Sequence, residues 1–328
     1  MHVPHQPLLE SVPNVSVGRD AGRVEELLVR ARAGIGDGAT LDGSRAEIVD
    51  VHRDSDHDRS VLTFVGWGEA LAGGLEALAT ASVELIDLHA GHGVHPRVGV
   101  LDVLPVVPLD AEPASRAAAH RLVARLAEHL GKVHEVPVVA YGLDPAGDPY
   151  PGAGFAGAVR RGGPATVLGR VNAGELFLLA GHHEVHPTAG VTLAGVRDVL
   201  VAFNVDLVGD DLDAARDIAA RIRATAAGPD ALPGIRALGL RLASRGVVQV
   251  STNVERHTSC GPARVLETVH RLAAEHGIEL AAAELVGLAP DTALGALRFA
   301  AARVGVPVLA SEHASLDAAC SRVRNSGA

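Results

Sequence analysis

Along this chain, segments in which hydrophobic residues recur at helical spacing take turns with short apolar segments typical of strands. Val24, Leu27, Leu28 and Ala31 recur at helical spacing, whereas β-branched residues gather in short apolar runs. The helical spacing predicts helices at residues 21–33, 69–85, 112–130, 212–225, 262–276, 292–303 and 316–322. The apolar runs predict strands at residues 8–16, 46–52, 60–67, 98–109, 136–141, 199–208, 237–242, 247–253 and 278–288.

Loops and boundaries follow from stretches rich in Gly, Pro and Asp. Residues 34–43 predict a loop, and the less regular residues 142–186 contain the candidate domain boundary. Each half of the chain runs strand–helix–strand–strand–helix–strand, which predicts an α+β fold (α/β sandwich) of two tandem ferredoxin-like subdomains. We expect the subdomains at residues 1–180 and 181–300, followed by a helical tail at 301–328.

The stretch between the second helix and the following strand is the richest in side chains that could take part in catalysis. It contains three histidines spaced three apart (His89, His92 and His95), then Arg97, then Asp102 in the apolar run. A histidine held in an extended turn beside an arginine can abstract a proton near neutral pH. Two other interpretations remain open. The histidines are a metal set, to which His182, His183 and His186 would add, or they are chance residues of a solvated loop.

The hairpin predicted between the strands at 46–52 and 60–67 has an acidic tip at residues 53–59. Asp and Ser are turn formers, so this tip is either a solvated turn or a loop that faces a ligand.

Composition narrows the class of protein. The net charge of −10 argues against nucleic-acid binding driven by overall charge, and 48% hydrophobic residues support a substantial core. The two cysteines, Cys260 and Cys320, form no disulfide framework, which is typical of a cytoplasmic protein. The N-terminal residues lack the basic and apolar regions of a secretory leader, so we expect none, and we also expect no membrane span and no nucleotide cofactor, because no long apolar run and no glycine motif in its proper context is present.

Several segments together resemble one family, in order and with plausible spacing over residues 8 to 297. These segments are ESVPNVSVGR (10–19), DRSVLTFVG (58–66), HPRVGVLDVLPVVPL (95–109), PVVAYG (137–142), GVRDVLVAFNVDL (195–207), QVSTNV (249–254) and ELVGLAP (284–290). They resemble the formiminotransferase domain of glutamate formiminotransferase and of the bifunctional formiminotransferase-cyclodeaminase. Because the sequence stops soon after the match, we expect no cyclodeaminase domain.

The resemblance implies an activity, namely transfer of the formimino group from N-formimino-L-glutamate to N5 of tetrahydrofolate, a step of histidine degradation. It implies tetrahydrofolate as co-substrate, no metal, a homodimer, and a folate-binding cleft between the two subdomains. The family's catalytic base is the histidine of an HPR motif, which falls on His95. Small molecules, rather than nucleic acid or a membrane, are the expected partners.

Further site residues are expected from the same resemblance. Arg59 and Arg97 are candidates to bind substrate carboxylates, or they form structural ion pairs. Asp102 either orients a histidine or pairs with an arginine. Three asparagines either contact the folate or cap turns: Asn14, Asn204 and Asn253.

The chain also departs from the family pattern. Val94 stands where a glutamate usually precedes the HPR histidine, Val17 interrupts a Ser-Glu-Gly motif, and residues 181–189 replace an Asp-Phe-Gly-Pro segment. A carboxylate near the base would suit an amidine cation. The departures therefore leave open a formyl or other acyl donor, and also a non-catalytic folate-binding relative.

Overall fold

The computed structural model describes residues 6–91 and 93–325 and divides into two compact units. The first unit comprises the chain up to Asp198 together with the residues from Arg322 on, and the second runs from Val199 to Ser321. We expected the boundary at residues 180/181. It lies later because β8 (Thr192–Val196) pairs with two strands of the first sheet. None of the helices within the described ranges is long and apolar enough to cross a membrane.

A single mixed sheet forms the centre of the first unit. Besides β8, its strands are β1 (Leu9–Ser11), β2 (Asn14–Val15), β3 (Ala46–Asp54), β4 (Arg59–Gly66), β5 (Leu101–Pro108), β6 (Val138–Ala140) and β7 (Leu178–Ala180). The order across the sheet is β3, β4, then β1 and β2 in one position, then β5, β8, β6 and β7. Pro13, which has no backbone donor, lies between β1 and β2 and divides the predicted strand at 8–16.

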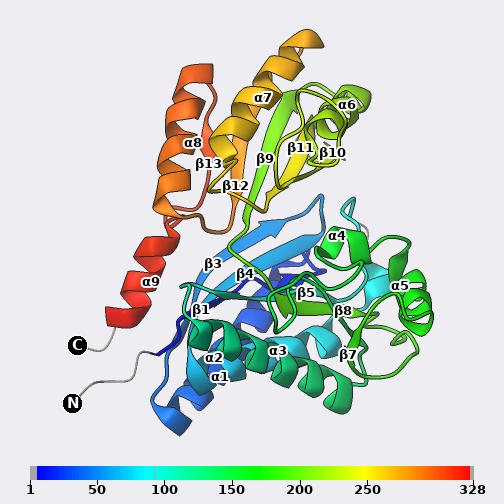
Figure 1. Cartoon of the computed structure of the whole chain (residues 1–328), viewed down its shortest axis with the longest axis vertical. Helices are drawn as coiled ribbons and strands as arrows, with labels where there is room; N and C mark the ends of the chain where they lie inside the picture. The colour runs from blue at the N-terminus through cyan, green and yellow to red at the C-terminus, as the bar shows by residue number, and fades with distance from the viewer. Residues whose placement is uncertain (1–5, 92, 326–328) are drawn as a thin grey trace. The chain divides into compact units, whose positions relative to one another are not determined.

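Helices cover this sheet unequally. Three long helices pack against one face, as Figure 1 shows: α1 (Ala21–Asp42), α2 (Gly68–Leu85) and α3 (Pro113–Val133). Leu101 and Leu104 of β5 join their core, whereas Val103 faces the opposite side. There it packs with residues of two shorter helices, α4 (Ala156–Val159) and α5 (Gly163–Asn172). The face opposite α1 to α3 is therefore only partly covered by helices of its own unit.

The expected loop at residues 34–43 is wrong, because α1 continues to Asp42. The glycines that suggested a loop instead allow α1 to approach α2 closely. A Cβ atom added to Gly34 would lie 2.3 Å from the carbonyl oxygen of Gly73, and one added to Gly38 would lie 2.1 Å from that of Glu69. The helix ends where Gly43 adopts a φ of 68°.

The second unit is a smaller sheet with helices against one face. Its elements are β9 (Val201–Val208), α6 (Leu212–Ile222), β10 (Ile235–Leu242), β11 (Val247–Val254), α7 (Pro262–Glu275), β12 (Leu280–Val286), α8 (Asp291–Val304) and β13 (Val308–Leu309). A last helix, α9 (Leu316–Asn325), follows. The sheet order is β10, β11, β9, β12 and β13, antiparallel except between β12 and β13. Alternate residues of β9, among them Val205 and Leu207, join residues of α6 and α7 in the core.

Candidate active site

The predicted base, His95, lies in the loop between η1 (Leu88–Ala90), a single 3₁₀ turn, and β5. This loop is fixed to the tip of the β3–β4 hairpin. The backbone N–H of Val94 donates to the carbonyl of Asp56 over 3.0 Å. A Cβ on Gly93 would lie 1.8 Å from the carbonyl oxygen of His57, so only glycine fits there. The half-buried imidazole is therefore carried by a loop with a defined position.

The hydrogen bonds of His95 define its tautomer. Nη1 of Arg59 lies 3.2 Å from Nε2, and the carbonyl oxygen of Pro96 lies 2.8 Å from Nδ1. A guanidinium group can only donate, so Nε2 must accept, and Nδ1 carries the proton that it donates to Pro96. Nε2 is consequently the basic nitrogen, and Arg59 covers its lone pair.

His95 is held in its neutral form. Burial lowers the pKa of His95 well below 6.5, and electrostatic interactions with Arg59, Arg160 and His57 lower it further, against the opposing bond to Pro96. Burial also lowers the pKa of Arg59 to about 10, so this arginine stays charged at neutral pH. An uncharged imidazole among cations is ready to accept a proton.

Asp102 pairs with an arginine and not with a histidine. It is almost fully buried in β5, where its Oδ1 accepts from the backbone N–H of Val98 over 2.7 Å. Its Oδ2 lies 2.8 Å from Nη2 of Arg160, the residue that caps the C-terminus of α4. The Nε of Arg160 is buried and has no hydrogen-bond partner in the described part of the chain. The sequence pattern did not single out Arg160.

Arg97 is the second predicted carboxylate ligand, and it lies against the hairpin tip. Its Nη1 is 3.7 Å from Oδ2 of Asp58, and its guanidinium fits beneath Gly91, whose added Cβ would lie 2.7 Å from Nη2. Asp58 also accepts from the backbone N–H groups of Gly18 and Arg19, at 3.0 and 3.1 Å. The ion pair with Asp58 therefore holds the side chain of Arg97 in place, although its Nη1 has no hydrogen bond to any described residue.

The tip of the hairpin is not a solvated turn. Asp56, His57 and Asp58 are all buried, although Asp and Ser dominate the local sequence. They are buried because the tip packs against the loops that contain Gly18 and Gly93. The acidic tip thus packs against the loop of His95 and fixes its position.

The first unit contains a second polar group that the sequence pattern did not predict. Arg197 hydrogen-bonds Tyr141 and acts electrostatically on Glu10 of β1. Burial raises the pKa of Glu10 to about 7 and also raises the pKa of Tyr141. The charges of Arg160 and Asp102 reach Tyr141 too, so this group adjoins the surroundings of His95. The signal that could have found these residues is their position inside the segments that carry the family resemblance.

The three candidate asparagines belong to different units of the chain. Asn14 of β2 donates from Nδ2 to the carbonyl of Val12 over 2.9 Å and so closes a local turn. Asn204 and Asn253 belong to the second unit. Asn204 is buried in β9 and donates to Glu284 over 2.9 Å, whereas Asn253 is exposed on β11. The first unit thus brings together His95, Arg59, Arg97 and Asp102.

The histidines of the alternative metal interpretation have other contacts. Nε2 of His89 lies 2.8 Å from the carbonyl oxygen of Pro187, and Nδ1 of His186 accepts from the backbone N–H of Ala189. His92 lies outside the described residues. Within residues 6–91 and 93–325 no three His, Cys, Asp or Glu side chains are grouped as metal ligands.

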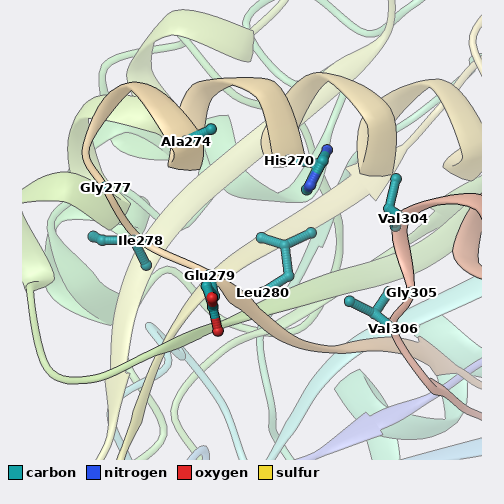
Figure 2. A pocket seen from close by; sticks show the side chains of 9 residues that line it. All are labelled: His270, Ala274, Gly277, Ile278, Glu279, Leu280, Val304, Gly305 and Val306. Atoms are coloured by element: carbon teal, nitrogen blue, oxygen red, sulfur yellow. The ribbon is translucent and has the colours of Figure 1, made fainter.

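A cavity of about 410 Å³ lies in the second unit, between the C-terminal half of α7, the start of β12 and the end of α8. Figure 2 shows that its lining is mostly aliphatic, with His270 and Glu279 as the titratable side chains among the lining residues. It has no cluster of reactive groups comparable with that around His95.

Fold and site together define an α/β protein with a neutral acid–base histidine among arginines, an arrangement suited to proton transfer on anionic substrates. Family comparisons make the class specific. The family model described as "Formiminotransferase domain, N-terminal subdomain" matches residues 8–197, and that described as "Formiminotransferase domain" matches residues 202–319. The chain therefore belongs to the formiminotransferase family.

Named relatives agree with this assignment. The chain is 31% identical over 287 residues to "Glutamate formimidoyltransferase" of Streptococcus pyogenes, which covers 88% of this chain and 90% of that protein. It is 32% identical over 288 residues to the protein of the same name from Thermoplasma acidophilum, covering 88% and 89%. It is also 32% identical over 312 residues to "Formimidoyltransferase-cyclodeaminase" of Sus scrofa, which covers 93% of this chain and 54% of that longer protein.

Proposed function

We propose that the protein transfers the formimino group of N-formimino-L-glutamate to N5 of tetrahydrofolate, which yields 5-formiminotetrahydrofolate and L-glutamate. Membership of the formiminotransferase family and the names of the relatives support this reaction. The observation that carries the mechanism is the neutral His95, whose Nε2 is the accepting nitrogen.

His95 is the general base and then the general acid of this reaction. N5 is a secondary amine and loses a proton as it attacks the formimidoyl carbon, and Nε2 of His95 accepts that proton. The tetrahedral intermediate collapses when the bond from carbon to the glutamate nitrogen breaks, and the imidazolium returns the proton to this leaving amine. Proton transfer of this kind accounts for about 10²- to 10⁴-fold in rate, and positioning of both substrates contributes further.

The arginines bind carboxylates of the two substrates. Arg59 covers Nε2 of His95 in the structure, but a guanidinium bonds more strongly to a carboxylate than to a neutral imidazole. An arriving carboxylate therefore draws Arg59 away and exposes the base. Arg97 and Arg160 each have a buried nitrogen without a hydrogen bond to the described residues, and Asp102 holds Arg160 in place. Asn14, Asn204 and Asn253 are the proposed amide contacts to tetrahydrofolate, and the mechanism requires no metal.

The proposal extends to fold family and assembly. In the second unit β12, β9, β11 and β10 have the strand order and antiparallel pairing of a ferredoxin-like sheet, and β5, β1/β2, β4 and β3 have the same order in the first. We therefore classify both units as ferredoxin-like, the first with an added β8–β6–β7 extension. A homodimer is the proposed assembly, and sedimentation equilibrium of the purified protein tests it.

The reaction is tested with purified protein, N-formimino-L-glutamate and tetrahydrofolate, by following the folate absorbance spectrum and the released glutamate. Wild type and His89→Ala should both turn over, because His89 is an exposed histidine of η1, just before the loop of His95. His95→Ala should lose about 10²- to 10⁴-fold in kcat. Equal activity of the two alanine variants would remove His95 from the mechanism.

The same assay separates the alternative donors. Val94, which is 46% exposed, stands next to His95 where the family usually has a glutamate. This position therefore supplies no carboxylate to bind the amidinium of a formimino donor. If N-formyl-L-glutamate is the better substrate, the donor is a formyl compound. If tetrahydrofolate binds and neither donor reacts, the protein is a folate-binding relative without this activity.

A further inference from the structure

The tip of the β3–β4 hairpin places a second imidazole beside the proposed base. The ring centroids of His57 and His95 are 5.7 Å apart, and the ring planes are inclined by 55°. Both ring nitrogens of His95 have other partners, namely Arg59 and the carbonyl oxygen of Pro96, so His57 acts on His95 through space. His57 is 4% exposed and His95 is half-buried, so water screens their interaction weakly.

Asp54 supplies a counter-charge for His57. Its Oδ1 accepts from the backbone N–H of His57 over 2.7 Å, and its Oδ2 lies 3.8 Å from Nδ1 of the ring. Asp56 and Asp58 of the same turn are buried as well, and a buried carboxylate requires positive charges or hydrogen-bond donors around it. Asp58 has Arg97 as its ion-pair partner, and Asp54 has His57. The carboxylates of the tip therefore favour the protonated form of His57.

Backbone contacts hold His57 in this position. The backbone N–H of Val94 donates to the carbonyl of Asp56, and a Cβ on Gly93 would meet the carbonyl oxygen of His57. These contacts use main-chain atoms of the tip, so they remain when the side chain of residue 57 is changed. Arg59, by contrast, turns toward the carboxylate of an arriving substrate in the proposed mechanism. His57 therefore stays beside the base while the substrates react.

We propose that His57, held as an imidazolium by Asp54, is a positioning residue that drives the proton of His95 onto the departing glutamate nitrogen. This inference rests on the proposed function. An alkyl amine is a poor leaving group until it is protonated, so general-acid help matters most in this half of the transfer. A positive charge on a ring whose centroid lies 5.7 Å away destabilises the imidazolium of His95 but not its neutral ring.

The proton balance of the reaction is unchanged by this role. N5 gives its proton to Nε2 of His95, and the glutamate nitrogen receives that proton as its bond to carbon breaks. His57 neither gains nor loses a proton, and it acts only by making the imidazolium of His95 a stronger acid. The interaction with His57 lowers the pKa of His95, which is the direction that this role requires.

Other charged side chains belong to the elements around the two rings. They are Arg53, Asp54, Asp56, Asp58 and Arg59 of the hairpin, Arg19 before α1, Arg97 in the loop of His95, Asp102 of β5 and Arg160 at the end of α4. All of them are retained when residue 57 alone is changed. The difference between wild type and such a variant therefore isolates the contribution of His57.

The first experiment observes the two imidazoles in the free, full-length protein by ¹H–¹⁵N NMR. His57 should carry both ring protons at pH 7 in wild type but only one in Asp54→Asn, whose amide oxygen can still accept from the backbone. In His57→Gln the pKa of His95 should rise by about 0.5–2 units, the range that Coulomb's law gives at 5.7 Å for effective dielectric constants of about 80 and about 20.

The control for this titration is His89→Gln, because His89 is an exposed histidine of η1. It should leave the pKa of His95 unchanged. Thermal unfolding shows whether each variant is folded. A single ring proton on His57 at pH 7 in wild type, or an unchanged pKa of His95 in folded His57→Gln, would overturn the inference.

The second experiment measures kcat, which reports the substrate-bound enzyme. In His57→Gln the acid limb of the kcat profile should move to higher pH, and kcat on the plateau should fall about two- to tenfold, with both KM values unchanged. His57→Lys keeps a positive charge beside Asp54 and should stay close to wild type. Equal losses in the Gln and Lys variants, or a plateau that does not fall in His57→Gln, would make the role of His57 structural and overturn the inference.

Failure of this inference and failure of the proposed function give different results. If wild type transfers no formimino group, the proposed function fails, and the NMR titration still decides whether His57 acts on His95. If wild type transfers the group and His57→Gln keeps both the pKa of His95 and kcat, the proposed function stands and the role of His57 is overturned.

Discussion

The contact between Arg59 and His95 predicts how activity depends on pH. The substitution Arg59→Gln removes a positive charge whose Nη1 lies 3.2 Å from Nε2 of His95. Burial is the largest cause that lowers the pKa of His95, and the charge of Arg59 is the next. Loss of the guanidinium removes the charge and admits water, and both changes raise the pKa of His95.

Coulomb's law gives the expected size of the change. Two unit charges at the 3.2 Å between these nitrogens repel by about 1 kcal/mol in bulk water and by about 5 kcal/mol at an effective dielectric constant of about 20. The charges of a guanidinium and an imidazolium are spread over several atoms, so we take about 1–3 kcal/mol. That energy corresponds to a rise of about 1–2 units in the pKa of His95.

Two measurements test this rise. Titration of the ring nitrogens by ¹H–¹⁵N NMR gives the pKa of His95 in the free protein. The acid limb of the kcat/KM profile should move to higher pH by the same amount, because the base works only when neutral. Arg161→Gln is the control, since Arg161 is exposed and adjacent to Arg160. A pKa of His95 that is unchanged or lower in Arg59→Gln would refute the reasoning.

Three further predictions concern stability and the position of the base. Burial raises the pKa of Glu10 from 4.5 to about 7, so the free energy of unfolding falls as pH rises through this window. Glu10→Gln removes this loss. In urea unfolding, the free energy of unfolding of the variant relative to wild type should be about 3 kcal/mol higher at pH 8 than at pH 4.5. Asp102→Ala leaves Arg160 without its buried partner and should lower the free energy of unfolding by about 3 kcal/mol, whereas a loss below about 1 kcal/mol would show that water replaces the carboxylate. Gly93→Ala should reduce kcat at least about tenfold, because its Cβ meets the His57 carbonyl and a small displacement of the base has a large effect. Unchanged kinetics would mean that this loop adapts.

Local pattern predicted much of the fold because the order of elements depends mainly on hydrophobic periodicity. The strand–helix–strand–strand–helix–strand order of both halves is present, and most predicted elements differ from the observed ones only at their ends. The prediction of a loop at 34–43 was wrong because Gly34 and Gly38 allow α1 to pack closely against α2, a contact with residues far along the sequence. The late division after Asp198 depends on the pairing of β8 with β5 and β6, which no local pattern contains.

The candidate site shows the same limit. The resemblance over seven segments identified His95, in its HPR motif, as the candidate base, and the need to bind substrate carboxylates suggested Arg59. The sequence could not show that Arg59 covers Nε2, nor that Arg160 pairs with Asp102 from a helix 58 residues further along the chain.

By itself the sequence determined the family, the order of the elements and the candidate base, because these depend on residue types at fixed local spacing. Only the tertiary structure decided the tautomer of His95, its lowered pKa and the burial of the acidic hairpin tip. Each of these depends on atoms brought together from distant segments, and hydrogen bonding, desolvation and charge act over distances in space rather than along the chain.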